Sequence, residues 1–210
     1  MQFGVDEAGK GPVLGSMFAA AVRAPEAALP DAIDDSKRLS ATRREELESG
    51  LRSDDRIEIA VAEIDPPRID SGNMNELAVE AHAEAALPIA RRGDRGLCDA
   101  ADVDAERFAA RVEAAIETDV TIEATHGADA ESPHVGAASI VAKTERERHV
   151  ATLRERYGEV GSGYPSDPET RSFLRRYLSE HGTFPEPTRT SWSTCDSIRA
   201  EAEQADLDDF

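Results

Sequence analysis

Acidic side chains stand at three places where this sequence could build a divalent-metal site. Asp6 and Glu7 follow a short apolar segment and precede a glycine-rich turn, Asp99 follows another apolar segment, and Asp129 precedes a long helical pattern. Carboxylate oxygens are hard ligands of the kind that suits Mg²⁺ or Mn²⁺. Each place also has a purely structural interpretation, namely a solvated acidic turn for Asp6 and Glu7 and stabilisation of a helix N-terminus for Asp129.

The pair Asp6 and Glu7 can serve one site only with help from the backbone. Adjacent residues of a strand point to opposite faces, so both carboxylates face the same site only where the strand ends or bulges. We expect residues 2–5 to form a strand that ends at Asp6, and the turn at Gly9-Lys10-Gly11 to supply the break. This turn matches neither the phosphate-binding pattern GxxxxGK[ST] nor the dinucleotide pattern GxGxxG, so we expect neither kind of nucleotide site there.

Lysine is rare in the chain, and its positions are informative. Of the 24 basic residues only Lys10, Lys37 and Lys143 are lysine. Lys143 lies four residues after Ser139, on the same face of the expected helix. An ammonium group beside a metal site would bind phosphate as a point charge. All three lysines lie in segments that are candidates on other grounds, although three residues can also cluster by chance.

The overall charge argues in the opposite direction. The 210 residues carry 43 acidic and 24 basic side chains, which gives a net charge of −19. An acidic, lysine-poor surface suits a protein in concentrated salt, where repulsion beyond a few ångströms is screened. The competing interpretation is an acidic protein that avoids nucleic acid. We find no secretory signal and no membrane-spanning segment. The two cysteines are far apart in the sequence. We therefore expect a cytoplasmic protein.

The hydrophobic pattern predicts an α/β fold in which helices pack on a mixed sheet. Asp104 is typical of a helix N-cap, whereas Asp102 competes with Asp99 as the candidate acid at a strand end, where sites form in such sheets. We divide the chain into a catalytic domain of residues 1–175 and a helical extension of residues 176–210. Strands are expected at residues 2–5, 14–22, 56–64, 96–99 and 120–122, and helices at residues 40–53, 74–91, 104–116, 133–157 and 168–181, followed by a polar helical tail.

Six segments occur in a fixed order along the chain. They are Gly4 to Gly15, Asp35-Ser36-Lys37-Arg38-Leu39-Ser40, Asp99 to Val103, Ala137 to Lys143, Gly163-Tyr164-Pro165-Ser166-Asp167 and Ser191-Trp192-Ser193-Thr194. Together they resemble ribonuclease HII, the type 2 ribonuclease H, in an archaeal form from a halophile, and the resemblance covers Phe3 to about Thr194. It implies a ribonuclease H-like mixed five-stranded sheet and a site of four carboxylates, Asp6, Glu7, Asp99 and Asp129, that holds two Mg²⁺ or Mn²⁺ ions.

The resemblance also implies a substrate and its contacts. An endonuclease of this family cleaves the RNA strand of RNA/DNA hybrids and ribonucleotides embedded in DNA, and it leaves 3′-hydroxyl and 5′-phosphate ends. The loop of Gly9, Lys10 and Gly11 would read the 2′-hydroxyl, and Tyr164 would pack on the sugar of the neighbouring deoxynucleotide. Backbone phosphates would be contacted by Lys37, Ser139 and Lys143.

Departures from the family pattern and other classes of protein remain open at this point. Lys10 stands where the family has arginine, so the bidentate phosphate contact of a guanidinium is lost, and Ser16 stands where proline is common. The type 3 relatives carry an extra N-terminal domain, which we do not expect because the acidic site begins at residue 6. A non-catalytic hybrid-binding module and an acidic metal-buffering protein are the alternatives, and a cleavage assay with metal separates them from the enzyme.

The C-terminal tail contains a spacing typical of peptides that dock on DNA sliding clamps. Gln204, Leu207 and Phe210 form a glutamine, an aliphatic residue at +3 and an aromatic residue at +6. In one helical turn Leu207 and Phe210 share a face and could enter an apolar pocket. The alternative is a frayed acidic terminus. We expect a monomer whose partners are nucleic acid and, through this tail, the clamp.

Overall fold

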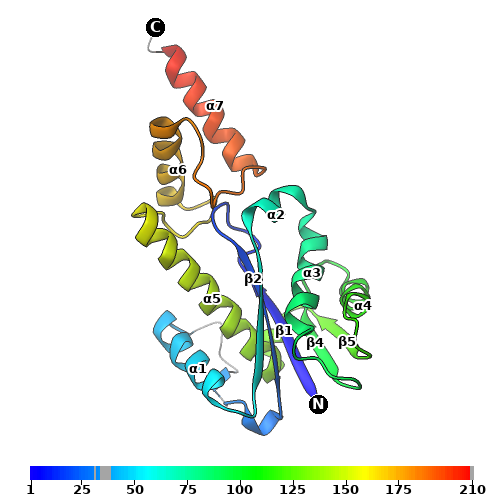
Figure 1. Cartoon of the computed structure of the whole chain (residues 1–210). Helices are drawn as coiled ribbons and strands as arrows, with labels where there is room; N and C mark the ends of the chain where they lie inside the picture. Colours follow the sequence, from blue (N-terminus) through cyan, green and yellow to red (C-terminus); the bar gives the residue numbers. More distant parts are fainter. Residues whose placement is uncertain (31, 34–38, 209–210) are drawn as a thin grey trace.

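A five-stranded mixed sheet forms the centre of the protein. The computed structural model describes residues 1–30, 32–33 and 39–208. The strands lie in the order β3-β2-β1-β4-β5 (Figure 1). Neighbours β1, β2 and β3 are antiparallel, whereas β4 runs parallel to β1 and β5 runs parallel to β4. The strand bounds are Gln2–Ala8, Met17–Ala24, Glu58–Ile64, Arg95–Asp99 and Thr121–Thr125. This confirms the predicted fold class.

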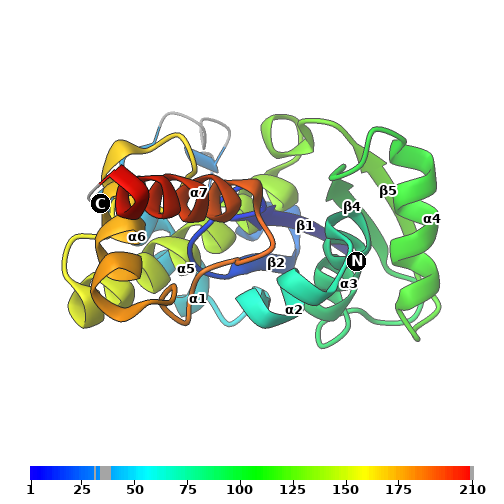
Figure 2. The ribbon, with the colours of Figure 1, turned by 90° about the horizontal axis from the view of Figure 1, so that it is seen from above.

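Helices cover both faces of the sheet. Helix α5 (Pro133–Tyr157) crosses β1 and β2 on one face, and α1 (Ala41–Ser53) packs against it. Helices α3 (Met74–Ala86) and α4 (Ala105–Ala115) cover the other face (Figures 1 and 2). Two separate apolar cores result, one between the sheet and each helical layer.

The alternation of side chains along β1 determines which layer each residue faces. Phe3 and Val5 are buried in the core under α3 and α4. Gly4 faces α5, and a Cβ atom there would lie 2.3 Å from main-chain atoms of His134 and Val135. Because every second residue of a regular strand faces the same side of the sheet, Asp6 must face the α5 layer, like Gly4. Glu7 must face the α3 layer, like Phe3 and Val5.

The strand β1 is longer than its sequence predicts. It pairs with β2 as far as the partners Ala8 and Phe18, so the prediction that the strand ends at Asp6 is wrong. Pairing with β2 is a contact between distant residues, and it extends the strand beyond its apolar segment. Similarly, β2 begins at Met17 rather than at Leu14, which forms an isolated bridge with Thr188.

Local capping signals predicted several helix starts correctly. The Ser40 side chain accepts a hydrogen bond from the Arg43 amide at the start of α1, and Asp104 accepts one from Arg107 at the start of α4. The helix expected to reach residue 91 ends at Ala86. Helix α2 (Pro66–Ser71) was not predicted; Asp65 caps it, and proline fits its first turn.

The C-terminal helices pack together beyond the end of the sheet. Helices α6 (Pro168–His181) and α7 (Ser193–Asp208) share an apolar core with the end of α5 (Figure 1). Residue 175, where we divide the chain, lies inside α6, and the division into two domains stays a prediction. No helix among the described residues is both long and apolar enough to cross a membrane.

Candidate active site

Three of the four predicted carboxylates meet at one edge of the sheet. Asp6 lies near the end of β1, Asp99 is the last residue of β4, and Asp129 lies in the 3₁₀ helix η3 (Ala128–Ala130). One carboxylate oxygen from each lies within 4.8 Å of those of the other two. Asp6 and Asp129 are buried and Asp99 is half-buried. The group forms because the parallel strands β1 and β4 end at the same edge.

Crowding and burial make this group electrostatically unfavourable without a cation. Burial, with the neighbouring charge of Glu7, raises the pKa of Asp6 from 3.8 to about 7, although a hydrogen bond with Ser139 opposes this. Burial, with the charges of Asp129 and Glu7, also raises the pKa of Asp99. That carboxylate accepts hydrogen bonds from the amides of Gly127 at 2.6 Å and Ala128 at 3.1 Å.

These residues fit a divalent metal ion. Buried carboxylates that are close enough to raise one another's pKa gain most from a cation that all of them can coordinate. An all-oxygen set of this kind matches Mg²⁺ or Mn²⁺ and contains none of the thiolate or imidazole ligands that softer metals prefer. The donor set therefore supports a metal-binding role for Asp6, Asp99 and Asp129.

Glu7 occupies a different position from the other three acids. Its side chain points to the α3 layer, where Oε2 lies 2.8 Å from Nε2 of the buried His82, a residue 75 positions away in the sequence. Burial favours the neutral acid, but the hydrogen bond and charge of His82, together with Lys10, lower the pKa of Glu7 overall. Glu7 is thus an ionised carboxylate held beside the acidic group by His82, and its role as a metal ligand stays a prediction.

A hollow of about 290 Å³ adjoins Glu7 and collects most of the predicted substrate residues. Gly9 adopts a φ of 89°, and a Cβ atom there would lie 2.9 Å from the Ser16 carbonyl oxygen, so the turn requires glycine. Tyr164 is 40% exposed at the rim, and the Arg146 guanidinium lies 4.8 Å from its ring centroid. The lining residues include Glu7, Gly9, Lys10, Gly11, Lys143, Arg146 and Tyr164.

The two lysines at this hollow are held by neutral oxygens. Lys143 donates to the Ser139 hydroxyl at 2.7 Å, and Ser139 in turn hydrogen-bonds Asp6. Lys10 donates to the main-chain oxygen of Ala101. Neither contact neutralises the ammonium charge. Lys37, the third predicted phosphate contact, lies outside the described residues.

Sequence reasoning missed three residues of this region, His82, Arg146 and Arg189. Arg146 could have been found, because it lies three residues after Lys143 and seven after Ser139 on the same helix. His82 carries no local signal, since it is linked to Glu7 by a contact between residues 75 positions apart. Arg189 is buried in the segment that connects α6 to α7 and donates hydrogen bonds to the glycine turn.

Asp102 does not join the acidic group in the way Asp99 does. Its carboxylate forms an ion pair with Arg107 at 2.8 Å and accepts a hydrogen bond from the Val103 amide at 2.7 Å. The hydrogen bond from Arg107 lowers the pKa of Asp102. Asp102 therefore has a structural role at the start of α4 and offers a neighbouring control for mutations of the site.

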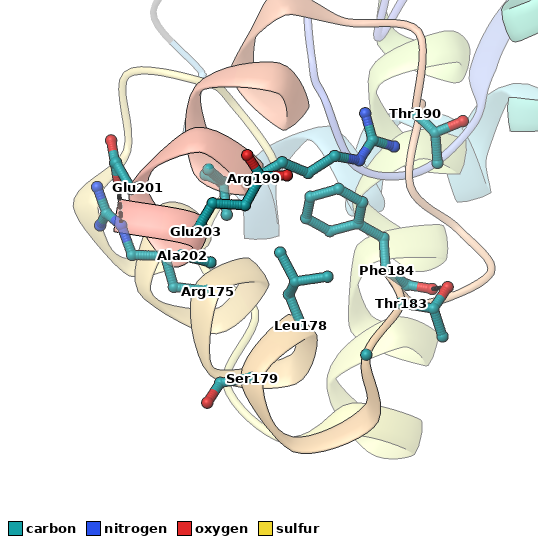
Figure 3. A pocket seen from close by; sticks show the side chains of 12 residues that line it. Arg175, Leu178, Ser179, Thr183, Phe184, Thr190, Arg199, Glu201, Ala202 and Glu203 are labelled. Atoms are coloured by element: carbon teal, nitrogen blue, oxygen red, sulfur yellow. Dashed lines mark hydrogen bonds and ion pairs between the residues drawn. The ribbon is translucent and has the colours of Figure 1, made fainter. Parts of the chain in front are cut away.

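A larger hollow of about 760 Å³ lies between α6 and α7, away from the acidic group (Figure 3). Leu178 and Phe184 form its floor, and Arg175 is paired with Glu201 at 2.6 Å beside it. No acid of the metal group lines it, and its cations are engaged by neighbouring carboxylates or aromatic rings. It marks the junction of the two C-terminal helices.

The tail motif is described only in part. Helix α7 extends to Asp208, and Gln204 is exposed on it. The side chain of Leu207 and all of Phe210 lie outside the described residues.

A mixed five-stranded sheet with acidic side chains gathered at the ends of its parallel strands defines a protein of the ribonuclease H-like fold. The chain belongs to the ribonuclease HII family, whose sequence model, described as Ribonuclease HII, matches residues 3–195. Membership makes the chain an endoribonuclease. A curated ribonuclease HII from the halophilic archaeon Natronomonas pharaonis is 63% identical over 207 residues, which cover 99% of this chain and 98% of the relative.

Two solved structures support the same assignment. Ribonuclease H2 from Pyrococcus horikoshii is 37% identical with a TM-score of 0.87, and the match covers 95% of this chain and 97% of that one. Ribonuclease HII in the PCNA complex from Archaeoglobus fulgidus is also 37% identical, with a TM-score of 0.84 and the same coverage.

Proposed function

We propose that this enzyme cleaves the RNA strand of RNA/DNA hybrids and cuts DNA at single embedded ribonucleotides, leaving 3′-hydroxyl and 5′-phosphate ends. The observation that carries the proposal is the position of the acidic group Asp6, Asp99 and Asp129 beside the hollow formed by the glycine turn, Lys143 and Tyr164. A phosphate bound at the acids would place its neighbouring sugars against that hollow.

In this proposal Asp6, Asp99 and Asp129 hold the divalent ions. Glu7 contributes its carboxylate from the opposite face of β1. When bound, Mg²⁺ or Mn²⁺ supplies Lewis acidity and charge stabilisation at the scissile phosphate. The hydrogen bond between Lys143 and Ser139, and that between Ser139 and Asp6, orient the Asp6 carboxylate. The Lys143 ammonium group attracts the phosphate backbone.

The glycine turn and Tyr164 would select the sugar. A Cβ atom on Gly11 would lie 3.5 Å from the Tyr164 ring, so the backbone of the turn approaches the aromatic side chain closely. A ribose 2′-hydroxyl that enters the hollow beside the turn could exchange hydrogen bonds with its backbone, whereas a deoxyribose has no such hydroxyl. Because Tyr164 is 40% exposed, the part of its ring that Arg146 does not cover can pack on the adjacent sugar.

A cleavage assay tests the proposal. Duplex DNA with one ribonucleotide is incubated with the enzyme and Mg²⁺ or Mn²⁺ at low and at molar salt, and the ends of the product are analysed. We expect a single cut with a 3′-hydroxyl end, and we expect Asp99→Asn to lower the rate at least about 100-fold because a metal ligand loses its charge. Asp102→Asn is the matched control and should retain the wild-type rate. Wild-type cleavage by Asp99→Asn would refute the site.

We also propose that the tail docks on a DNA sliding clamp. Support comes from the spacing of Gln204, Leu207 and Phe210, from the projection of α7 away from the sheet (Figure 1), and from the relative that was solved with PCNA. Binding of the intact protein to the clamp is measured by calorimetry. Phe210→Ala should weaken it at least tenfold and Asp209→Ala should not, while cleavage of short duplexes stays unchanged in both. Unchanged clamp affinity after deletion of residues 204–210 would contradict the proposal.

A further inference from the structure

Arg189 is a fully buried cation in the segment that joins α6 to α7, with 0% of its surface exposed. Its guanidinium donates three hydrogen bonds to main-chain oxygens of the glycine turn and the residues after it. Nε donates to Gly15 at 2.9 Å, Nη1 to Lys10 at 2.9 Å and Nη2 to Gly9 at 2.6 Å. The C-terminal part of the chain is thereby bonded directly to the turn that lines the candidate substrate hollow.

Such a group is costly to bury. Desolvation lowers the pKa of Arg189 to about 10, and within the described part of the chain its partners are backbone oxygens rather than a carboxylate at ion-pair distance. A buried cation with polar partners is often no more stabilising than an apolar side chain of similar volume. Stability alone therefore does not account for arginine here, whereas the fixed planar fork of its donors does constrain the geometry of the three carbonyls.

The three hydrogen bonds determine which way the peptide groups of the turn point. In a trans peptide the C=O and the following N–H are directed oppositely. Because the carbonyls of Gly9 and Lys10 point at Arg189, the amide N–H groups of Lys10 and Gly11 point away from it. Lys10 and Gly11 both line the hollow beside Tyr164. The guanidinium thus fixes the direction of the two amide N–H groups that would donate to a ribose or phosphate oxygen.

The segment around Arg189 is itself held firmly. The Asp70 carboxylate accepts hydrogen bonds from the amides and hydroxyls of both Thr190 and Ser191, at distances of 2.7 to 3.1 Å. The Arg189 amide donates to the Val13 carbonyl at 2.8 Å, and its guanidinium lies 5.4 Å from the Trp192 ring centroid. These contacts hold the backbone of the segment in place, so the Arg189 guanidinium can keep the turn in one position.

We propose that Arg189 is a positioning residue that orients the Gly9–Gly11 turn and thereby sets the enzyme's discrimination in favour of single embedded ribonucleotides. The inference rests on the proposed function, in which this turn contacts the ribose. A uniform hybrid presents a 2′-hydroxyl at every step of the RNA strand and tolerates a displaced turn. A single ribonucleotide offers one hydroxyl at one place, so misplacement of about 1 Å can reduce turnover by about 10²-fold.

The test compares Arg189→Lys with Arg156→Lys, a matched control on the surface of α5 whose guanidinium pairs with Glu186. Lysine keeps the charge at position 189 but cannot reach three carbonyls with a planar fork. We measure kcat and KM on a single-ribonucleotide duplex and on a uniform hybrid. Arg189→Lys should lower the ratio of kcat/KM between the two substrates at least tenfold, and Arg156→Lys should leave it unchanged.

A second measurement is independent of catalysis. In the metal-free protein, hydrogen exchange of the peptide that contains residues 9–11 should accelerate at least tenfold in Arg189→Lys, while Mn²⁺ affinity measured by calorimetry stays within twofold. If Arg189→Lys does not fold, Asp70→Ala, which frees the neighbouring Thr190 and Ser191, should produce the same two changes to a smaller extent.

An unchanged substrate ratio, or unchanged exchange at residues 9–11, would overturn the inference even if the melting temperature fell. Failure of the wild-type enzyme to cut single ribonucleotides would instead refute the proposed function. In that case the exchange measurement still decides whether Arg189 positions the turn.

Discussion

Replacing Asp6 by asparagine should stabilise the metal-free protein while it abolishes activity. The Asp6 carboxylate is buried near the other acids, and its pKa rises from 3.8 to about 7 because burial and the charge of Glu7 disfavour ionisation. Asparagine has nearly the same shape and no charge. Without metal, the substitution removes the repulsion and should stabilise the fold. With metal, it removes a candidate ligand, so the variant should gain less stability from metal binding than the wild type.

The pKa values give the size and pH range of the effect. Below about pH 4 the Asp6 side chain is protonated in both the folded and the unfolded state, so its ionisation costs nothing. Between about pH 4 and 7 the unfolded chain releases the proton and the folded protein keeps it, so stability falls as pH rises. Above pH 7 ionising the buried Asp6 carboxyl lowers the free energy of unfolding by about 4 kcal/mol, because each unit by which the pKa is raised costs about 1.4 kcal/mol. For a chain of this length that is roughly 10 °C in melting temperature.

Thermal unfolding in EDTA at pH 8 and at pH 4.5, at constant molar salt, measures the effect. Asp6→Asn should melt roughly 10 °C above the wild type at pH 8 and much closer to it at pH 4.5. Mn²⁺ at about 100 times its dissociation constant should add about 2.7 kcal/mol to the wild type and much less to the variant. Asp102→Asn, which loses the ion pair with Arg107, should not be stabilised. A lower melting temperature for Asp6→Asn in EDTA at pH 8 would refute the reasoning.

Three further predictions concern packing, positioning and salt. Gly4→Ala would place a Cβ atom 2.3 Å from the backbone of α5, so we expect a loss of about 3 kcal/mol or more in chemical denaturation; a loss below 1 kcal/mol would contradict the close approach. His82→Leu removes the N–H donor to Glu7 and should weaken Mn²⁺ binding about 10- to 100-fold in calorimetry. His82→Gln keeps an N–H donor and should weaken Mn²⁺ binding less than His82→Leu does. Because 43 acids repel one another less when screened, the melting temperature should rise between 0.1 and 2 M salt, and a steady fall would count against this.

Local signals in the sequence were sufficient for some features and insufficient for others. Ser40 and Asp104 were recognised as N-caps because a cap depends only on residues within one turn. Asp6 and Asp99 were singled out because both were expected at strand ends, and they meet because the parallel neighbours β1 and β4 finish at the same edge of the sheet. The end of β1 was misplaced because pairing with β2 as far as Ala8 depends on a partner strand that local pattern does not reveal.

The contacts that shape the site most strongly link residues far apart in the chain. Glu7 and His82 are separated by 75 positions, and Arg189 reaches Gly9 across 180. Neither histidine nor arginine at those positions differs in local pattern from an ordinary helix or loop residue. The glycine turn became a candidate through the family resemblance, whereas the buried guanidinium that bonds to it could be found only after the two segments were placed side by side.

The net charge of −19 does not oppose nucleic-acid binding once the partners of individual cations are considered. Across the surface, arginines are paired with carboxylates, as in the contacts of Arg68 with Glu80 and of Arg148 with Glu48. At the candidate substrate hollow, Lys143 donates to the Ser139 hydroxyl and Arg146 donates to the Ser162 carbonyl, both neutral acceptors. At about 1 M salt the Debye length is ~3 Å, so distant acids are screened. In the proposed complex, a phosphate at the hollow would therefore be governed by the adjacent cations and by a metal ion held at the acidic group, and not by the acids of the remaining surface.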